Sequence, residues 1–114
     1  MIDLTDVKEI YIYKEICDLR IGINGLAILA QELVDISNMK HKLFIFFGTT
    51  RKNIKILALD NDGWWLYQKK LFEGKYLFPK DISEITKAEL HMLLNGLSIE
   101  TYRKHKNAKI SISY

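Results

Sequence analysis

Six basic side chains flank two turn-like segments in the middle of the chain. They are Arg51, Lys52 and Lys55 around the first segment, and Lys69, Lys70 and Lys75 around the second. If the residues between them pair as antiparallel strands, these cations gather on one side or one end of a sheet. Grouped cations match the charge of a phosphate backbone, so this region is the leading candidate for DNA contact. A surface for a protein partner and plain solvation of a sheet face are the alternatives.

Aromatic rings in the same region are secondary candidates. They are Trp64, Trp65, Tyr67 and Tyr76. Aromatic side chains on an open sheet can stack on unpaired bases, which would add to phosphate contacts. Adjacent residues of a strand point to opposite faces, however, so at least one of the two tryptophans is expected in the core.

Asp18 and Arg20 form a second polar candidate pair. One interpretation is a binding function. The favoured interpretation is structural: the Asp18 carboxylate caps a helix and pairs locally with Arg20, a contact worth at most about 1 kcal/mol when exposed.

The side chains in the sequence do not make up a recognisable catalytic site. Metal-dependent cleavage or transfer of a DNA strand needs several carboxylates that converge on divalent metal ions. Asp60 and Asp62 lie in a predicted turn, and no third acid has a spacing that demands convergence. The turn also lacks the length and acidic pattern of a calcium loop. With scattered histidines and no recognisable nucleophile and base, we predict a protein that is not an enzyme and uses neither metal nor cofactor.

The strands that must position the basic residues form a predicted antiparallel meander. Residues 43–47 are apolar throughout, which is typical of a central strand covered on both faces. Residues 54–59 and 64–71 follow, joined by a tight turn at 60–63, and residues 75–78 form a short last strand. Residues 9–13 predict a further strand from their β-branched and aromatic side chains.

Two amphipathic helices complete the predicted α+β fold. Apolar residues at three- and four-residue spacing predict the first helix from about Asp18 to 36–38. The second begins at a capping box, with Thr86 and Glu89 three residues apart, and stops near Gly96. Residues 100–114 are either a flexible basic tail or an added edge strand.

Length and composition favour one domain over residues 1–114, since the chain can bury one core but not two. Residues 37–80 carry nine basic and three acidic side chains, so the positive charge is concentrated in the meander. Cys17 is the only cysteine, and no membrane span or secretory signal is evident, so we expect a cytoplasmic protein.

Several segments resemble, in order and spacing, the TnpB (second open reading frame) accessory proteins of the insertion-sequence sixty-six family. Residues 17–27 with Gln31-Glu32 resemble a signature of that family. Further blocks that match the family continue through the meander to Leu97. The blocks together cover residues 9–99, and their collinearity makes the resemblance specific. The chain departs from the family pattern at several positions, and at Phe72 the family has an acidic residue.

The resemblance implies an accessory protein encoded beside a separate transposase and needed for efficient bacterial transposition. The partners it implies are the DNA of the insertion-sequence ends and the transposase of the same element. The first hypothesis is therefore a protein that binds DNA or the transposase–DNA complex through the basic meander. The alternative is a protein-interaction subunit that contacts the transposase without touching DNA.

Overall fold

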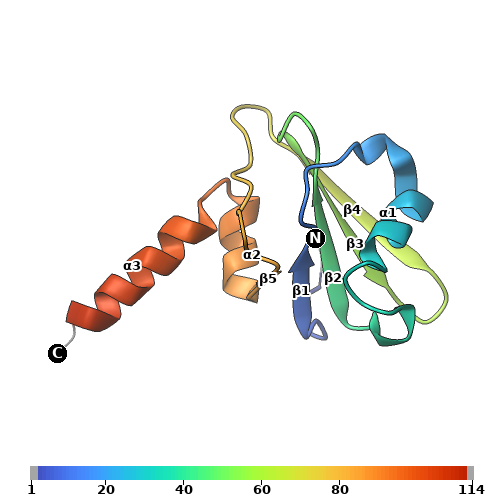
Figure 1. The fold of residues 1–114 in the computed structure, drawn as a ribbon, viewed down its shortest axis with the longest axis horizontal. Helices are drawn as coiled ribbons and strands as arrows, with labels where there is room; N and C mark the ends of the chain where they lie inside the picture. The colour runs from blue at the N-terminus through green and yellow to red at the C-terminus, as the bar shows by residue number, and fades with distance from the viewer. Residues whose placement is uncertain (1–2, 113–114) are drawn as a thin grey trace.

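The computed structural model describes the backbone of residues 3–112 and the side chains of residues 3–105. Its centre is a five-stranded sheet with helices on both faces (Figure 1). The strands are β1 (Glu9–Ile12), β2 (Lys42–Phe47), β3 (Asn53–Leu59), β4 (Trp64–Lys70) and β5 (Glu84–Ile85), and the helices are α1 (Gly22–Ala30), α2 (Lys87–Leu94) and α3 (Ile99–Ile112). The predicted α+β class is confirmed.

The strand order across the sheet is β4-β3-β2-β1-β5. β2, β3 and β4 form the predicted antiparallel meander, and the tight turn at 60–63 joins β3 to β4. β1 lies parallel to β2, which requires a crossover connection, and α1 lies within that connection. β2 is therefore the central strand, as its apolar run predicts.

The core has two layers because β2 is buried on both faces. Phe44 and Phe46 pack under α1 against Leu26 and Ala30, and we call this side the α1 face. Leu43, Ile45 and Phe47 point the other way and pack against Leu90 and Leu93 of α2, on the α2 face. Alternation along a strand sends successive side chains to opposite layers, so one strand supplies both.

Two predicted elements differ from the structure. The first helix is shorter than predicted, because the Ala30 carbonyl accepts hydrogen bonds from both Leu33 and Val34 and the backbone becomes extended at Asp35. Residues 75–78 form no strand. Instead Tyr76 is fully buried and its backbone N–H donates to the Arg51 carbonyl, so this segment crosses the end of the sheet.

Two alternatives are open for residues 100–114, a flexible tail or an edge strand, and in the part that the structure describes α3 continues to Ile112. The Ser98 hydroxyl accepts from the Thr101 backbone N–H at 3.1 Å and caps the start of α3, and Ile99 is buried. These two contacts favour a helix over a strand at this point. Residues 113 and 114 lie outside the described part of the chain.

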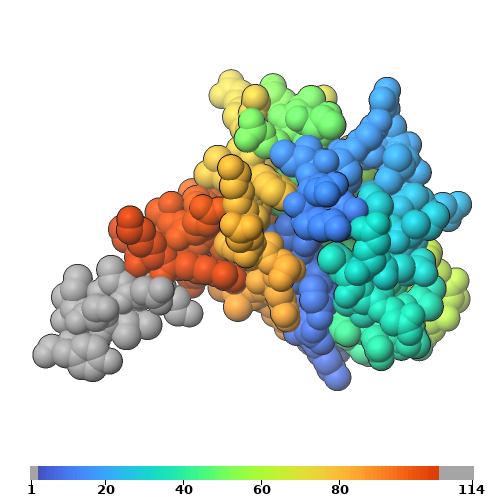
Figure 2. Space-filling view, in the orientation of Figure 1, coloured from blue at the N-terminus to red at the C-terminus, as the bar shows by residue number. Residues whose placement is uncertain are grey.

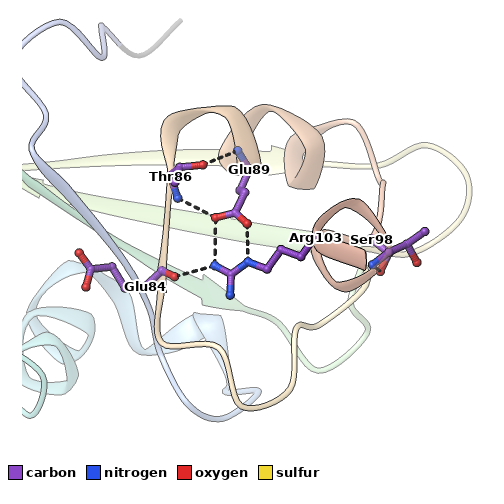
Figure 3. Close-up of polar contacts among 6 residues, drawn as sticks. Glu84, Thr86, Glu89, Ser98 and Arg103 are labelled. Carbon is purple, nitrogen blue, oxygen red and sulfur yellow. Dashed lines mark hydrogen bonds and ion pairs between the residues drawn. The ribbon is translucent and has the colours of Figure 1, made fainter. Parts of the chain in front are cut away.

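A buried carboxylate joins the last two helices (Figure 3). The predicted capping box is confirmed: the Glu89 backbone N–H donates to the Thr86 hydroxyl at 3.1 Å, and Glu89 accepts from the Thr86 backbone N–H at 2.9 Å. Arg103 donates to both carboxylate oxygens of Glu89 and to the Glu84 carbonyl, so one side chain of α3 is tied to α2 and β5.

None of the helices within residues 3–112 is both long enough and apolar enough to cross a lipid bilayer.

The Glu89 network makes stability depend on pH. Hydrogen bonds from Arg103 hold the pKa of the Glu89 carboxyl below its ordinary value of 4.5, although burial opposes this. A carboxyl group whose pKa is lower in the folded state than in the unfolded state stabilises the fold. This stabilisation is complete at pH values above the pKa of the unfolded state, and it is lost as the pH falls through the pKa of the folded state. We expect Glu89→Gln to reduce the free energy of unfolding by roughly 2 kcal/mol at neutral pH.

The measurement is urea denaturation of both proteins at a series of pH values. The variant should lose less stability than the parent as the pH is lowered below about 5. Glu73→Gln, at an exposed position, serves as the control and should follow the parent. Parallel stability curves for Glu89→Gln and the parent would contradict the assigned role.

Candidate nucleic-acid interface

The two basic turns lie side by side at one end of the sheet. The 48–52 turn follows β2, and the 71–78 loop follows β4 (Figure 1). The Leu71 backbone N–H donates to the Lys52 carbonyl at 2.9 Å, and the Tyr76 N–H donates to the Arg51 carbonyl at 2.6 Å. In the space-filling view the green turn and the yellow loop adjoin at the top of the molecule (Figure 2). The backbone itself therefore holds the two turns together.

Local backbone geometry fixes each turn. The Gly48 N–H donates to the Asn53 carbonyl at 3.0 Å and closes the first turn, while the Arg51 N–H donates back to Gly48. Arg51 has a φ of 59°, in the left-handed region that non-glycine residues enter at a cost of roughly 1–2 kcal/mol. Gly74 takes the equivalent conformation in the second turn, with a φ of 76° and no steric cost.

Four of the six candidate cations belong to this end. Arg51, Lys70 and Lys75 are exposed, and Lys52 is half-buried. We call these four residues the cationic end. Among the side chains that the structure describes, none of the four is in an ion pair, and Glu73 is the acidic residue that shares their loop.

Lys55 and Lys69 do not join the cationic end. The Lys55 side chain lies on the α1 face, and its ammonium donates to the Leu19 carbonyl at 2.8 Å. The Lys69 side chain lies on the α2 face and donates to the Leu94 carbonyl at 2.9 Å, at the C-terminal end of α2, where a cation is favourable. Both ammonium groups satisfy backbone acceptors, which gives each of them a structural role.

Asp18 and Arg20 form the predicted local pair. The Asp18 carboxylate accepts from the Arg20 backbone N–H at 3.0 Å and from its guanidinium at 2.7 Å, which caps the short 3-10 turn Leu19–Ile21. The guanidinium holds the pKa of the Asp18 carboxyl at about 2. The pair lines a cavity of about 340 Å³ together with Thr49, Thr50 and Asn53, so it adjoins the first basic turn.

The aromatic candidates are divided between the two faces, and the prediction for Tyr76 is wrong, because its ring is fully buried in the core of the α2 face and cannot stack on a base. Trp64 packs on the α1 face, as the alternation of the strand requires, whereas Trp65 is 56% exposed on the other face. The indole N–H of Trp65 donates to the Asp60 carboxylate, and its ring stacks on Tyr67 with centroids 6.3 Å apart. Both tryptophans begin β4, and the cationic end starts at its last residue, Lys70, about 20 Å further along the strand.

Asp60 serves the hairpin turn, as predicted. Its carboxylate accepts from the backbone N–H groups of Asp62 and Gly63 at 3.1 and 3.0 Å, which orders the turn and lowers the pKa of the Asp60 carboxyl. Over the residues that the structure describes, no three His, Cys, Asp or Glu side chains are grouped so that they could hold a metal ion.

Phe72 also lies at this end of the sheet, and the sequence did not identify it as a candidate functional residue. The side chain is 101% exposed, in the loop that carries Lys75. The signal that could have identified it is an aromatic residue within a basic turn, at a position where related sequences are expected to have an acidic residue.

Comparison with known proteins gives a family and one relative. A family model described as IS66 Orf2 like protein matches residues 8–104. The uncharacterized protein y4hO of Sinorhizobium fredii is 30% identical over 96 residues, which cover 78% of this chain and 84% of that protein. No solved structure matches the chain significantly.

Substitution of a lysine that bonds a backbone carbonyl should change the free energy of unfolding more than substitution of a lysine of the cationic end. We expect Lys55→Met to lower the free energy of unfolding by about 1 kcal/mol, because the Leu19 carbonyl loses its donor while the alkyl stem is kept. Lys70→Met, at an exposed position of the cationic end, should change it by less than about 0.5 kcal/mol. Urea denaturation at one pH measures both, and equal effects would contradict the division.

Proposed function

The chain belongs to the IS66 Orf2-like family of insertion-sequence accessory proteins, and on that premise we propose that it supports transposition by binding DNA through its cationic end. The single observation that carries the DNA-binding part is the joining of two basic turns by backbone hydrogen bonds. Four cations from segments about twenty residues apart thereby share one end of the molecule.

Electrostatics favours a phosphate backbone as the ligand of this end. Cations that replace the counterions condensed on DNA release them into solution, and this release drives binding. The positive field is local, since the formal net charge of the whole chain is only +3. A local field of this kind orients the protein so that the 48–52 turn and the 71–78 loop meet the DNA first.

The family is of an accessory, non-catalytic kind. In this proposal the chemistry of strand transfer belongs to the transposase of the same element, and this chain contributes binding and positioning. The DNA of the element ends is the corresponding ligand. Phosphate contacts alone give affinity and orientation, whereas sequence preference requires contacts with base edges or dependence on DNA shape.

A second candidate function is binding of the transposase without DNA contact. The exposed Trp65 ring stacks on Tyr67, and Tyr67 with Leu90 and Leu94 lines a cavity of about 540 Å³ between β4 and α2. Tryptophan and tyrosine are enriched at protein interfaces, and this surface contains none of the four residues of the cationic end, although its cavity extends along β4 to Lys69. The two functions therefore use separable residues.

The test of DNA binding is a titration of duplex DNA over a range of salt concentrations. For the parent protein, the logarithm of the affinity should fall linearly with the logarithm of salt concentration. In the variant Arg51→Ala/Lys70→Ala/Lys75→Ala, we expect the slope to decrease by about 0.9 for each phosphate that the variant no longer neutralises.

The matched control removes the same charge elsewhere. Lys8→Ala/Lys40→Ala/Lys87→Ala changes three exposed lysines outside the cationic end, and Lys8 and Lys40 precede β1 and β2 rather than following β2. This variant should keep the parent slope. Equal slopes for the two triple variants would reject the cationic end as the contact, and absence of binding by the parent would reject the proposal itself.

A further inference from the structure

Phe72 occupies the most exposed position of any large apolar side chain that the structure describes. Its side chain is 101% exposed, whereas the next most exposed, Ile28, is 66% exposed. A fully exposed phenylalanine ring makes no packing contribution to its own fold, and its hydration is unfavourable. Folding stability therefore does not account for an aromatic residue at this position.

The ring is carried by an anchored loop. The Leu71 N–H, directly before Phe72, donates to Lys52, and the Tyr76 N–H donates to Arg51 four residues after it. Tyr76 is itself fully buried, and its ring packs edge-on against Phe47 of the central strand with centroids 6.4 Å apart. Phe72 thus stands on a support that is fixed on both sides.

Charged residues surround Phe72 along the chain. Lys70 lies two residues before it and Lys75 three residues after it, and both are exposed. The bonded partner turn adds Arg51 and Lys52. One exposed ring therefore lies in a loop that has a cation before it and another after it in the sequence, with Glu73 as its immediate neighbour.

We propose that Phe72 is a wedge that enters the base stack of duplex DNA when the cationic end binds the phosphates; this inference rests on the proposed function. Proteins that kink DNA insert one apolar side chain between base steps while nearby cations hold the backbone. The energy lost by partial unstacking is offset by burial of the ring and by the closer approach of the bent backbone.

The surroundings favour DNA over a protein as the occupant. The core of a protein interface is depleted of charged residues, whereas Phe72 has Lys70, Glu73 and Lys75 as close neighbours in its loop. Leu77 is the other apolar side chain that the loop exposes, at 48%. It provides a matched control in the same segment.

The experiment uses short duplexes rich in TA and CA steps, which kink easily, with 2-aminopurine at successive positions and a fluorophore pair at the ends. Fluorescence of 2-aminopurine rises when a base is unstacked, and energy transfer between the ends reports bending. With the parent protein we expect both signals to change on binding. Phe72→Ala should lose both signals and bind about tenfold more weakly, yet keep the parent salt slope, because its phosphate contacts are intact.

Two further variants sharpen the result. Leu77→Ala should behave as the parent in both fluorescence signals. Phe72→Leu, which keeps an apolar wedge, should retain part of the unstacking and bending. Thermal unfolding of Phe72→Ala should match the parent because the ring is fully exposed in the fold, so a change in DNA binding reports on the complex.

The outcomes separate the wedge from the proposed function. If the parent binds with a steep salt slope but Phe72→Ala binds equally well and neither protein unstacks a base, the wedge is rejected and the proposed function stands. If Phe72→Ala instead weakens only the binding of purified transposase after nuclease digestion, Phe72 is a protein contact and the wedge is again rejected. If the parent does not bind duplex DNA even at low salt, both proposals fail.

Discussion

Burial of β2 on both faces is the constraint that shapes the remainder of this structure. Its five consecutive buried residues, 43–47, need a cover on each side, and α1 and α2 supply one each. Once both faces are covered, the surfaces left for binding are the ends of the sheet and its β4 edge. The basic turns lie at one end because they follow β2 and β4, and the Trp65–Tyr67 pair lies on the edge strand β4.

The same constraint divides the lysines. Strand alternation sends Lys55 to the α1 face and Lys69 to the α2 face, where each ammonium meets a backbone carbonyl left over by a turn or helix end. Lys70, the last residue of β4, continues into the loop that crosses the sheet end and remains exposed. Formal charge along the sequence therefore overestimates the charge available to a ligand, because part of it stabilises helix and turn ends.

The fold also separates two surfaces with different chemistry. The cationic end is charged and carries one exposed ring, whereas the surface between β4 and α2 is hollowed and mostly apolar. The two surfaces use different residues, but they adjoin, because the cavity extends along β4 to Lys69, the residue before Lys70.

Local features of the protein follow from its amino-acid order alone: the central strand, the meander with its turn at 60–63, the capping box at Thr86 and the family. Hydrophobic periodicity and turn chemistry are local signals, so they can be read without coordinates. Folding in three dimensions settled which lysines remain exposed, that residues 75–78 cross the sheet end, and that Arg103 pairs with Glu89 to hold α3. Each of these outcomes depends on contacts between residues distant in sequence, which alternation and spacing alone do not determine.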